Sequence, residues 1–420
     1  MPAVENPWRP SAMKVSETKG ESPSGFNSIR LIGSRMSMDI LEPISIESSD
    51  DWKNVISELD TWGEVPDSQI LEITSQSGNE RGLSLEIKCS DIRWLAEFLP
   101  WGSDNKLESK VINSHPSLDK PSGGYSWKGQ NLIILRKINN SHTNSNIELL
   151  QALKEENKEL ATKILYNSGK SLGIYHSSVK SVRETPMDQK RWNNRLINLE
   201  EKLRANTIWR APFSRKATCM LSLGDIRFKD ILISENDDYF IRLGPPRLAD
   251  GLYKPDCEFP AIRDLSCLIQ DLGRLYYSIQ SSIEITHLRK SLIEGWSDYA
   301  PPSWSSSDVF YTHKGGLAIW EYEQSLLDVL ESTANQSGPP TPAVQIISKV
   351  IPFQKSMYNS RTIAALSFLL IFLGVSTVIN SPPNSLLDAL IPSICIIFGY
   401  FTHSFYRRLS PPPEKPITDI

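Results

Sequence analysis

The sequence has few of the patterns that mark common enzyme classes. Its 420 residues contain neither the H-E-x-x-H spacing of zinc peptidases nor the G-x-S-x-G turn of serine hydrolases, and the six histidines are scattered. The five cysteines include no C-x-x-C pair, which argues against a zinc site and indicates free thiols in a reducing compartment. A formal net charge of only -4 provides no global basic surface, so we expect no nucleic-acid partner.

The N-terminal end lacks a basic segment followed by an apolar one, so we expect no secretory signal. Residues 1–50 are rich in Ser, Pro, Glu and Lys and show little apolar periodicity. Such a segment cannot bury enough apolar surface to offset the entropy lost on ordering. We therefore expect residues 1–50 to form a disordered tail.

Two long apolar runs lie near the C-terminal end, at residues 362–379 and 386–401, joined by a polar turn. A bilayer core of about 30 Å needs about 20 helical residues, so each run with its flanks is long enough to span it. Two core helices of a soluble domain are the alternative. We disfavour it because nothing would cover so much apolar surface. The sequence therefore predicts two transmembrane helices over residues 361–405, arranged as a hairpin.

Basic residues flank this hairpin on both sides. Lys349, Lys355 and Arg361 precede it, Arg407 and Arg408 follow it, and the connecting turn has no basic residue. The excess of positive charge on cytoplasmic flanks predicts that both ends of the hairpin face the cytoplasm. We expect an integral membrane protein with a cytoplasmic soluble part, cytoplasmic termini and a short cytoplasmic tail, 406–420.

Between the two ends the pattern changes from strands to helices. Alternating apolar residues around a turn at 77–82 predict a β-hairpin within a β-rich region, 51–137. From 138 to 333 apolar residues recur at helical spacing. A Pro-rich stretch then opens a linker and juxtamembrane segment, 334–360. The expected fold class is α+β.

The stretch 221–244 carries most of the functional signal. Asp225 lies in a loop before the apolar strand 231–233, and a second strand, 239–241, follows across a polar turn. This layout resembles the catalytic-loop hairpin of the protein-kinase-like superfamily, especially its aminoglycoside-phosphotransferase and lipopolysaccharide-kinase branch. The resemblance implies a two-lobed fold, β-rich and then helical, with ATP and Mg²⁺ as the cofactors of phosphoryl transfer.

The same resemblance assigns roles to residues of this loop. Asp225 takes the position of the catalytic base and Asp230 that of the metal-binding Asn, and an Asp there still binds Mg²⁺ through oxygen. Leu223 replaces the family's His, and Arg242 stands where the principal metal-binding Asp belongs. A guanidinium repels Mg²⁺, but Arg242 could contact a nucleotide phosphate or pair with one of the two Asp residues. Arg227 is a further candidate for contact with the nucleotide.

The strand lysine that contacts phosphates has two possible positions. In one alignment it is Lys88, with Glu108 as its helix partner. In the other, residues 94–99 form that strand and Glu97 replaces the lysine. The turn at 77–82 contains two glycines but no G-x-G-x-x-G, so it does not match the phosphate-covering loop.

Asp264, at the start of a predicted helix, resembles the acidic residue that holds the catalytic loop in kinases. An acidic residue that complements the helix dipole is an equally good explanation of this position.

Three functions follow from these features. The substitutions at positions 223 and 242 favour a membrane-anchored pseudokinase, a binding or regulatory module with an unidentified protein partner. The second hypothesis is an active, divergent phosphotransferase that uses Asp225 and Asp230 on a protein, lipid-linked or small-molecule hydroxyl. The third is a membrane scaffold with no nucleotide site.

Overall fold

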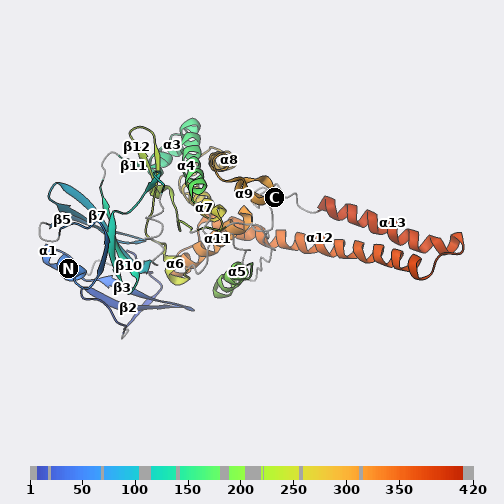
Figure 1. The fold of residues 1–420 in the computed structure, drawn as a ribbon, viewed down its shortest axis with the longest axis horizontal. Helices are drawn as coiled ribbons and strands as arrows, with labels where there is room; N and C mark the ends of the chain where they lie inside the picture. Colours follow the sequence, from blue (N-terminus) through green and yellow to red (C-terminus); the bar gives the residue numbers. More distant parts are fainter. Residues whose placement is uncertain are drawn as a thin grey trace.

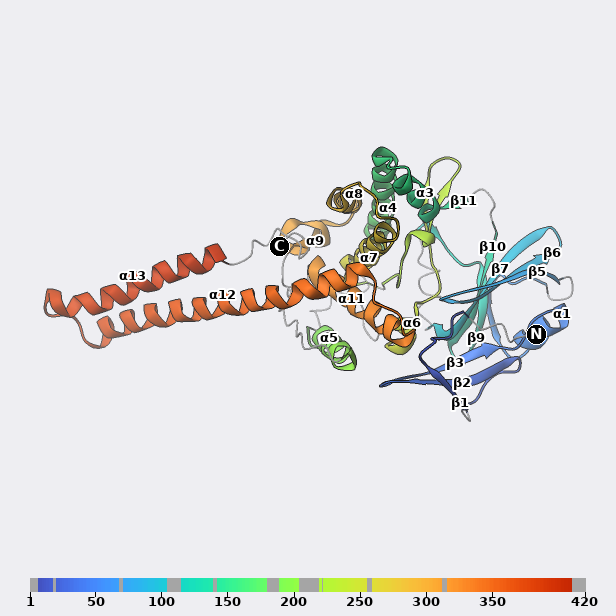
Figure 2. The same ribbon diagram turned by 180° about the vertical axis from the view of Figure 1, so that it is seen from behind.

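The computed structural model describes residues 7–17, 20–67, 71–103, 115–138, 142–179, 189–203, 219–220, 222–254, 259–311 and 316–409. A β-rich part and a helical part lie side by side, and two long helices project from the helical part (Figure 1). From behind, these two helices point away from the β-rich part (Figure 2). The expected order of a β-rich region followed by helices is therefore confirmed.

The β-rich part is built on a six-stranded antiparallel sheet in the order β4-β9-β10-β7-β6-β5. Its strands are β4 (Asp60–Gly63), β5 (Leu71–Asn79), β6 (Gly82–Cys89), β7 (Ile92–Ser103), β9 (Gly123–Trp127) and β10 (Gln130–Lys137). The hairpin expected around 77–82 is β5–β6, which confirms that prediction. Helix α1 (Ser49–Ile56) covers the sheet where Trp52 packs edge-on against Phe98 and Tyr125.

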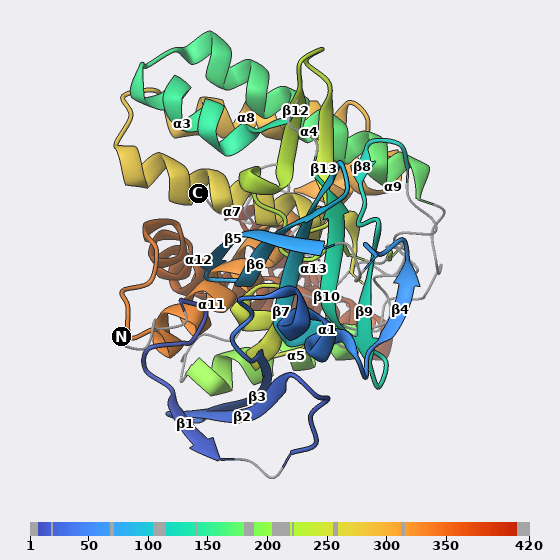
Figure 3. The ribbon, with the colours of Figure 1, turned by 90° about the vertical axis from the view of Figure 1, so that its left-hand side faces the viewer.

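The N-terminal segment is folded, and the expectation of a disordered tail is wrong for its described residues. Strands β1 (Lys14–Glu17), β2 (Phe26–Gly33) and β3 (Met36–Pro43) form an antiparallel sheet. Strand β3 packs against β7, and Figure 3 shows the small sheet beside the large one. The physical reason is a period of two in β3, where Met36, Met38 and Ile40 are buried and the residues between them are exposed.

The helical part encloses the hairpin that the sequence places at its centre. Strands β12 (Ile231–Ser234) and β13 (Tyr239–Arg242) pair antiparallel, as predicted, and β11 (His142–Asn144) and β8 (Leu118–Asp119) extend them to a four-stranded sheet. The surrounding helices are α3 (Ser145–Lys154), α4 (Lys158–Ser178), α5 (Gln189–Leu203), α6 (Leu248–Leu252), α7 (Ala261–Ile279), α8 (Ile285–Ser297), α9 (Pro302–Ser305), α10 (Ser307–Phe310) and α11 (Leu317–Ala334). Helix α7 is buried along most of its length and forms the centre of this part.

The projecting helices are α12 (Thr341–Asn380) and α13 (Leu386–Leu409). Two segments within them, Arg361–Asn380 and Leu386–Tyr406, are long and apolar enough to cross a membrane, with mean hydropathies of 2.4 and 1.5. The helices meet closely where the Ser367 hydroxyl donates to the carbonyl of Gly399 at 2.8 Å. The linker expected over 334–360 is corrected in part, because α12 is helical from Thr341 and its first turns pack against α7 and α11.

Candidate functional site

The loop that precedes β12 is held from behind by a buried carboxylate of α7. Asp264 is fully buried and accepts the backbone N–H of Leu223 at 3.0 Å and the hydroxyl of Ser222 at 2.5 Å. His176 of α4 lies 3.4 Å from the same carboxylate, and its Nδ1 receives the indole N–H of Trp296 at 2.9 Å. Because indole nitrogen only donates, Nδ1 must be unprotonated, and Nε2 carries the proton toward Asp264. Asp264 thus holds the loop, as the resemblance implies.

The far end of the loop is fixed in the same way. Asp271 of α7 accepts the backbone N–H of Phe228 at 2.8 Å, and the Ser145 hydroxyl donates to the carbonyl of Phe228 at 2.8 Å. Between the two ends, Gly224 has a φ of 96°, a backbone conformation that residues other than glycine rarely adopt. The backbone of the loop is therefore anchored at both ends by the helices behind it.

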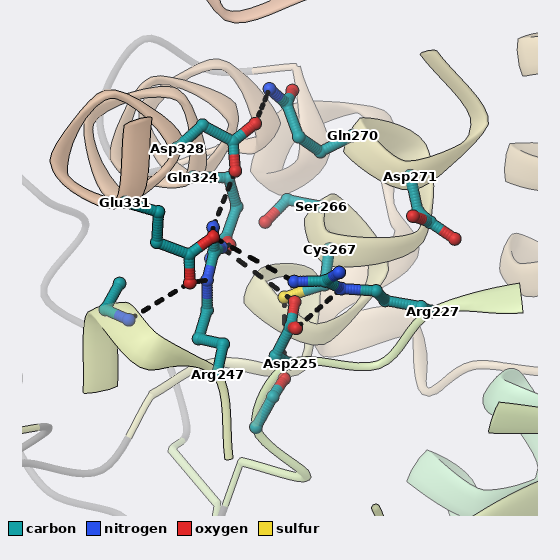
Figure 4. A network of polar contacts seen from close by, with 12 residues as sticks. Asp225, Arg227, Arg247, Ser266, Cys267, Gln270, Asp271, Gln324, Asp328 and Glu331 are labelled. Atoms are coloured by element: carbon teal, nitrogen blue, oxygen red, sulfur yellow. Dashed lines mark hydrogen bonds and ion pairs between the residues drawn. The ribbon is translucent and has the colours of Figure 1, made fainter. Parts of the chain in front are cut away.

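The front of the loop presents Asp225 to several arginines. Its carboxylate lies 2.7 Å from Nε of Arg227, 2.9 Å from Nη2 of Arg81 and 3.8 Å from Nη1 of Arg247. Figure 4 shows Arg227 and Arg247 directed toward it. Burial alone would raise the pKa of Asp225, but the guanidinium groups outweigh burial and hold this pKa well below its usual range. Asp225 is thus an ionised carboxylate with its charge balanced inside the protein.

Arg81 connects Asp225 to Asp230. It comes from the turn between β5 and β6, 149 residues before Asp230 in the chain. Its Nη1 donates to both oxygens of Asp230, at 3.0 and 2.9 Å, and its Nη2 donates to the side chain and the carbonyl of Asp225, both at 2.9 Å. The side chain is 3% exposed, so the guanidinium is sealed between the two carboxylates.

A second residue of the same turn contacts the loop from outside. Glu80 accepts the ammonium group of Lys229 at 2.6 Å and lies 3.3 Å from Nη1 of Arg227. Partial burial would raise the pKa of Glu80, but the Lys229 hydrogen bond and charge lower it to about 2. The tip of the β5–β6 hairpin is therefore tied to the loop by two consecutive charged side chains.

Arg247 links the site to α11. It follows two prolines after β13, and its guanidinium contacts Asp328 at 2.6 Å, Glu331 at 2.8 Å and the side-chain oxygen of Gln324 at 3.1 Å (Figure 4). Burial lowers the pKa of Arg247, but these carboxylates and Asp225 raise it well above its ordinary value. Arg247 therefore stays charged at any pH at which the protein folds.

The arrangement does not fit Mg²⁺ with a nucleotide phosphate. Phosphoryl transfer needs metal ions that bridge the acidic side chains and the phosphate oxygens. The cation of Arg81 lies between Asp225 and Asp230 and pairs with both, so it would repel a metal ion bound to either carboxylate. Within the described residues, no group of three or more His, Cys, Asp or Glu side chains is placed to hold a metal ion.

The other candidates from the sequence lie elsewhere. Arg242, at the end of β13, pairs with Asp119 of β8, with Nε and Oδ2 3.2 Å apart, and its described contacts do not include Asp225. Lys88 is exposed near the far end of β6, about 20 Å along the hairpin from Arg81 at the rise of a β-strand. Glu108 lies outside the described residues.

The strand order favours the second alignment of the lysine position. Strand β7 is the third along the β5–β6–β7 run, and its Glu97 accepts Nε of Arg136 at 2.9 Å. Arg136 of β10 also donates to the carbonyls of Asp119, at 3.0 Å, and Leu243. Glu97 and Arg136 thus join the β-rich part to the end of β13, where the resemblance places the principal metal-binding Asp.

Sequence reasoning missed Arg81, Arg136 and Arg247 as site residues. A signal existed for Arg81, since it is a basic residue next to Glu80 within the predicted hairpin turn at 77–82. Arg136 lies within β10 and Arg247 follows β13, and neither has a motif around it. Their roles depend on partners far away in the chain.

Comparison with known proteins gives similarity of structure alone. No family model matches the chain, and no curated protein matches it in sequence. A glucosamine kinase in complex with glucosamine, ADP and inorganic phosphate has a TM-score of 0.49 and 9% identity, over 84% of this chain and 95% of that one. A spectinomycin phosphotransferase with ADP and spectinomycin gives 0.33 and 13%, over 67% and 92%. A Plasmodium vivax ethanolamine kinase gives 0.34 and 10%, over 68% and 83%.

These three proteins are kinases or phosphotransferases of the protein-kinase-like superfamily. At such identities and TM-scores, the likeness carries no activity or substrate over to this chain. The chain's own layout carries the kinase-like description: a six-stranded sheet, a helical part, and a loop, strand, turn and strand held by a buried Asp between them.

Proposed function

We propose that the chain is a membrane-anchored pseudokinase, a binding or regulatory module that works at the cytoplasmic face of a membrane with a protein partner. One observation carries the proposal. Arg81 forms hydrogen bonds with both Asp225 and Asp230 and is buried between them. The residues that would bind metal and activate a hydroxyl are therefore engaged with the protein's own cation.

The chemistry of Asp225 supports the same conclusion. A general base works best when its pKa lies near the operating pH. The surrounding guanidinium groups hold the pKa of Asp225 well below its usual range, so its carboxylate has little tendency to take a proton. Removing one partner from a buried ion pair costs about 3–5 kcal/mol, so withdrawal of Arg81 alone, which leaves two buried carboxylates short of a cation, is costly.

The projecting hairpin supports the membrane part of the proposal. Only 11% of each apolar window of α12 and α13 is buried, and large side chains such as Phe368 and Ile379 are more than 70% exposed. A continuous apolar surface of this size requires cover, and lipid provides it. The basic flanks and the uncharged turn orient both ends of the hairpin toward the cytoplasm.

The test is thermal unfolding of the whole chain in lipid nanodiscs with ATP, with and without Mg²⁺. The whole chain is needed because β1 to β3 belong to the fold, so a fragment that starts at residue 51 would lose them. A ligand at 100 times its Kd would stabilise the protein by about 2.7 kcal/mol. We expect no stabilisation that depends on Mg²⁺. The Lys88→Ala variant is the control: because Lys88 is exposed and away from Arg81, this variant should respond to ATP and Mg²⁺ as the wild type does.

The possible results separate the three hypotheses. Stabilisation that requires Mg²⁺ would overturn the proposal and support an active phosphotransferase with Asp225 as base. Stabilisation by ATP alone would support a pseudokinase that binds nucleotide without metal. No response would support a module without a nucleotide site.

Membrane anchoring is tested separately. Membranes from cells that express the chain are washed at alkaline pH, which removes peripheral proteins. We expect the full chain to remain in the membrane pellet. Release into the supernatant would contradict an embedded hairpin.

A further inference from the structure

The described N-terminal residues 7–13, which we call the strap, lie between two distant parts of the molecule. Trp8 and Met13 are 5% and 7% exposed and belong to the hydrophobic core. The strap touches the β5–β6 hairpin at one end and the end of α11 at the other. It therefore joins the element that carries Arg81 to the element that carries the carboxylates around Arg247.

At the hairpin, the strap packs directly on the backbone of Gly78. A Cβ at this position would lie 2.7 Å from Cγ of Pro7 and 3.2 Å from Cζ3 of Trp8, which is too close for a side chain. Gly78 is three residues before Arg81. Any movement of Trp8 away from the sheet thus removes the packing on the strand three residues before Arg81.

At its other end, the strap caps α11. The Ala12 N–H donates to the carbonyl of Ala334 at 2.9 Å, and the Ser11 hydroxyl donates to the carbonyl of Asn335 at 2.5 Å. The last carbonyls of a helix have no partner within the helix, so these bonds fix the end of α11. Helix α12, the first of the two apolar helices, begins a few residues later at Thr341.

The hairpin needs this support because little else packs on its outer strand. Of the nine residues of β5, Leu71 is buried, and every residue from Thr74 to Asn79 is exposed. Strand β5 is also the end of the six-stranded order, with β6 as its partner in that sheet. Segments with few buried contacts are the first to open in a folded protein.

We infer that the strap is a latch that keeps the β5–β6 hairpin, and with it Arg81, closed over Asp225 and Asp230. Release of the strap frees the hairpin while the helical part stays folded. The inference rests on the proposed function in one respect, since closure by Arg81 is what the latch maintains. Because the latch ends on α11 beside the start of α12, it also links closure to the hairpin helices.

Hydrogen–deuterium exchange of the whole chain in nanodiscs tests the latch without nucleotide. Trp8→Ala removes the indole from Gly78. We expect exchange of the amides of residues 76–84 to become at least tenfold faster, with α4 and α8 unchanged. The matched control is Trp192→Ala, which truncates a tryptophan of α5 that is 4% exposed and packs on Trp320. It should leave residues 76–84 unchanged.

A second variant covers the case in which Trp8→Ala does not fold. Ser11→Asp keeps Trp8 but replaces an exposed hydroxyl donor with a carboxylate that faces the carbonyl of Asn335. It should speed exchange of 76–84 and of the last turn of α11 severalfold. Exchange of residues 76–84 that matches the wild type in both folded variants, or that rises equally in Trp192→Ala, would overturn the latch. Neither result depends on nucleotide binding, so failure of the latch and failure of the proposed function are distinguishable.

Discussion

The loop at residues 222–230 has two sides that differ in kind. On the side toward α7, buried carboxylates receive backbone N–H groups of the loop and set its shape. On the side toward the β-rich part, the loop's own carboxylates receive arginines instead. The contacts with α7 fix the backbone that positions Asp225. The arginines on the other side neutralise the charge of Asp225. Positioning and chemistry are therefore separable in this fold, and each side can be disturbed alone.

The largest effect is expected on the α7 side. Asp264→Ala leaves the N–H of Leu223, the hydroxyl of Ser222 and the imidazole of His176 without their acceptor, and each buried unpaired group costs about 1–3 kcal/mol. We expect a loss of about 4 kcal/mol in the free energy of unfolding, measured by urea denaturation. Asp264→Asn keeps one acceptor oxygen and should lose about half as much. Equal losses in both variants would show that charge, and not the count of acceptors, matters there.

The next effect tests the opposite side. Arg81→Met preserves the length of the side chain but leaves two buried carboxylates with fewer cations, and we expect a loss of about 3 kcal/mol by the same denaturation. Arg81→Lys restores the charge without the fork that reaches both carboxylates, so it should lie between Met and the wild type. If Arg81→Met had the same free energy of unfolding as the wild type, the ion pairs of Arg81 with Asp225 and Asp230 would not stabilise the loop.

Acid should act on the arginine side. The pKa values of Asp225, Asp328 and Glu331 are lowered in the fold by guanidinium groups, against the opposing effect of burial. A carboxylate with a lowered folded pKa stabilises the protein above its unfolded pKa of about 4 and loses that contribution as the pH falls toward the folded value. Denaturant midpoints should hold from pH 7 to about 5 and fall below about 4. A midpoint that rises on acidification would contradict these ion pairs.

The smallest effects come from the β-rich part. Glu97→Gln replaces the nearer of the two carboxylates beside the buried guanidinium of Arg136 with a neutral amide, while Asp119 stays 3.6 Å away, and should cost about 1–2 kcal/mol. Lys88→Ala changes an exposed side chain and should stay within about 0.5 kcal/mol. The two losses of unfolding free energy, measured in one denaturation series, are compared to test whether β7 or β6 carries the charged side chain that is buried at the site. A larger effect at Lys88 would reverse the choice between the two alignments.

Much of the fold was readable from local patterns. In the β5–β6 hairpin, the β12–β13 pair and the long helices, the spacing of the apolar residues predicts the element that forms. Asp264 holds the loop, as the resemblance implies. Strand β3 was also readable from its alternation, but the polar composition of residues 1–50 masked it. Composition measures how much a segment can bury on its own, while β3 is stabilised by packing on β7.

The site was less predictable, because its decisive contacts join residues far apart. Arg81 and Asp230 are 149 positions apart, and Arg247 lies 81 positions from Asp328. The sequence offers Arg242 as a cation that could pair with a nucleotide phosphate or with Asp225 or Asp230. In the structure, Arg242 pairs with Asp119 of β8 instead. The carboxylate of Asp225 pairs with Arg227, Arg81 and Arg247. No local sequence pattern specifies which arginine pairs with the carboxylates of the loop.

The continuous helix α12 fixes the distance between the folded body and the apolar segment that could cross a membrane. Val350 is buried against the body, and the apolar window begins at Arg361. The intervening residues, 351–360, span about 15 Å at 1.5 Å per residue, of which the headgroup layer takes about 6 Å. If the hairpin is embedded as proposed, the remaining helix holds the body about 9 Å from the lipid surface, roughly one Debye length, so the surface charge of the membrane is partly screened there. The proposed protein partner would then have to extend beyond the headgroups to reach the body.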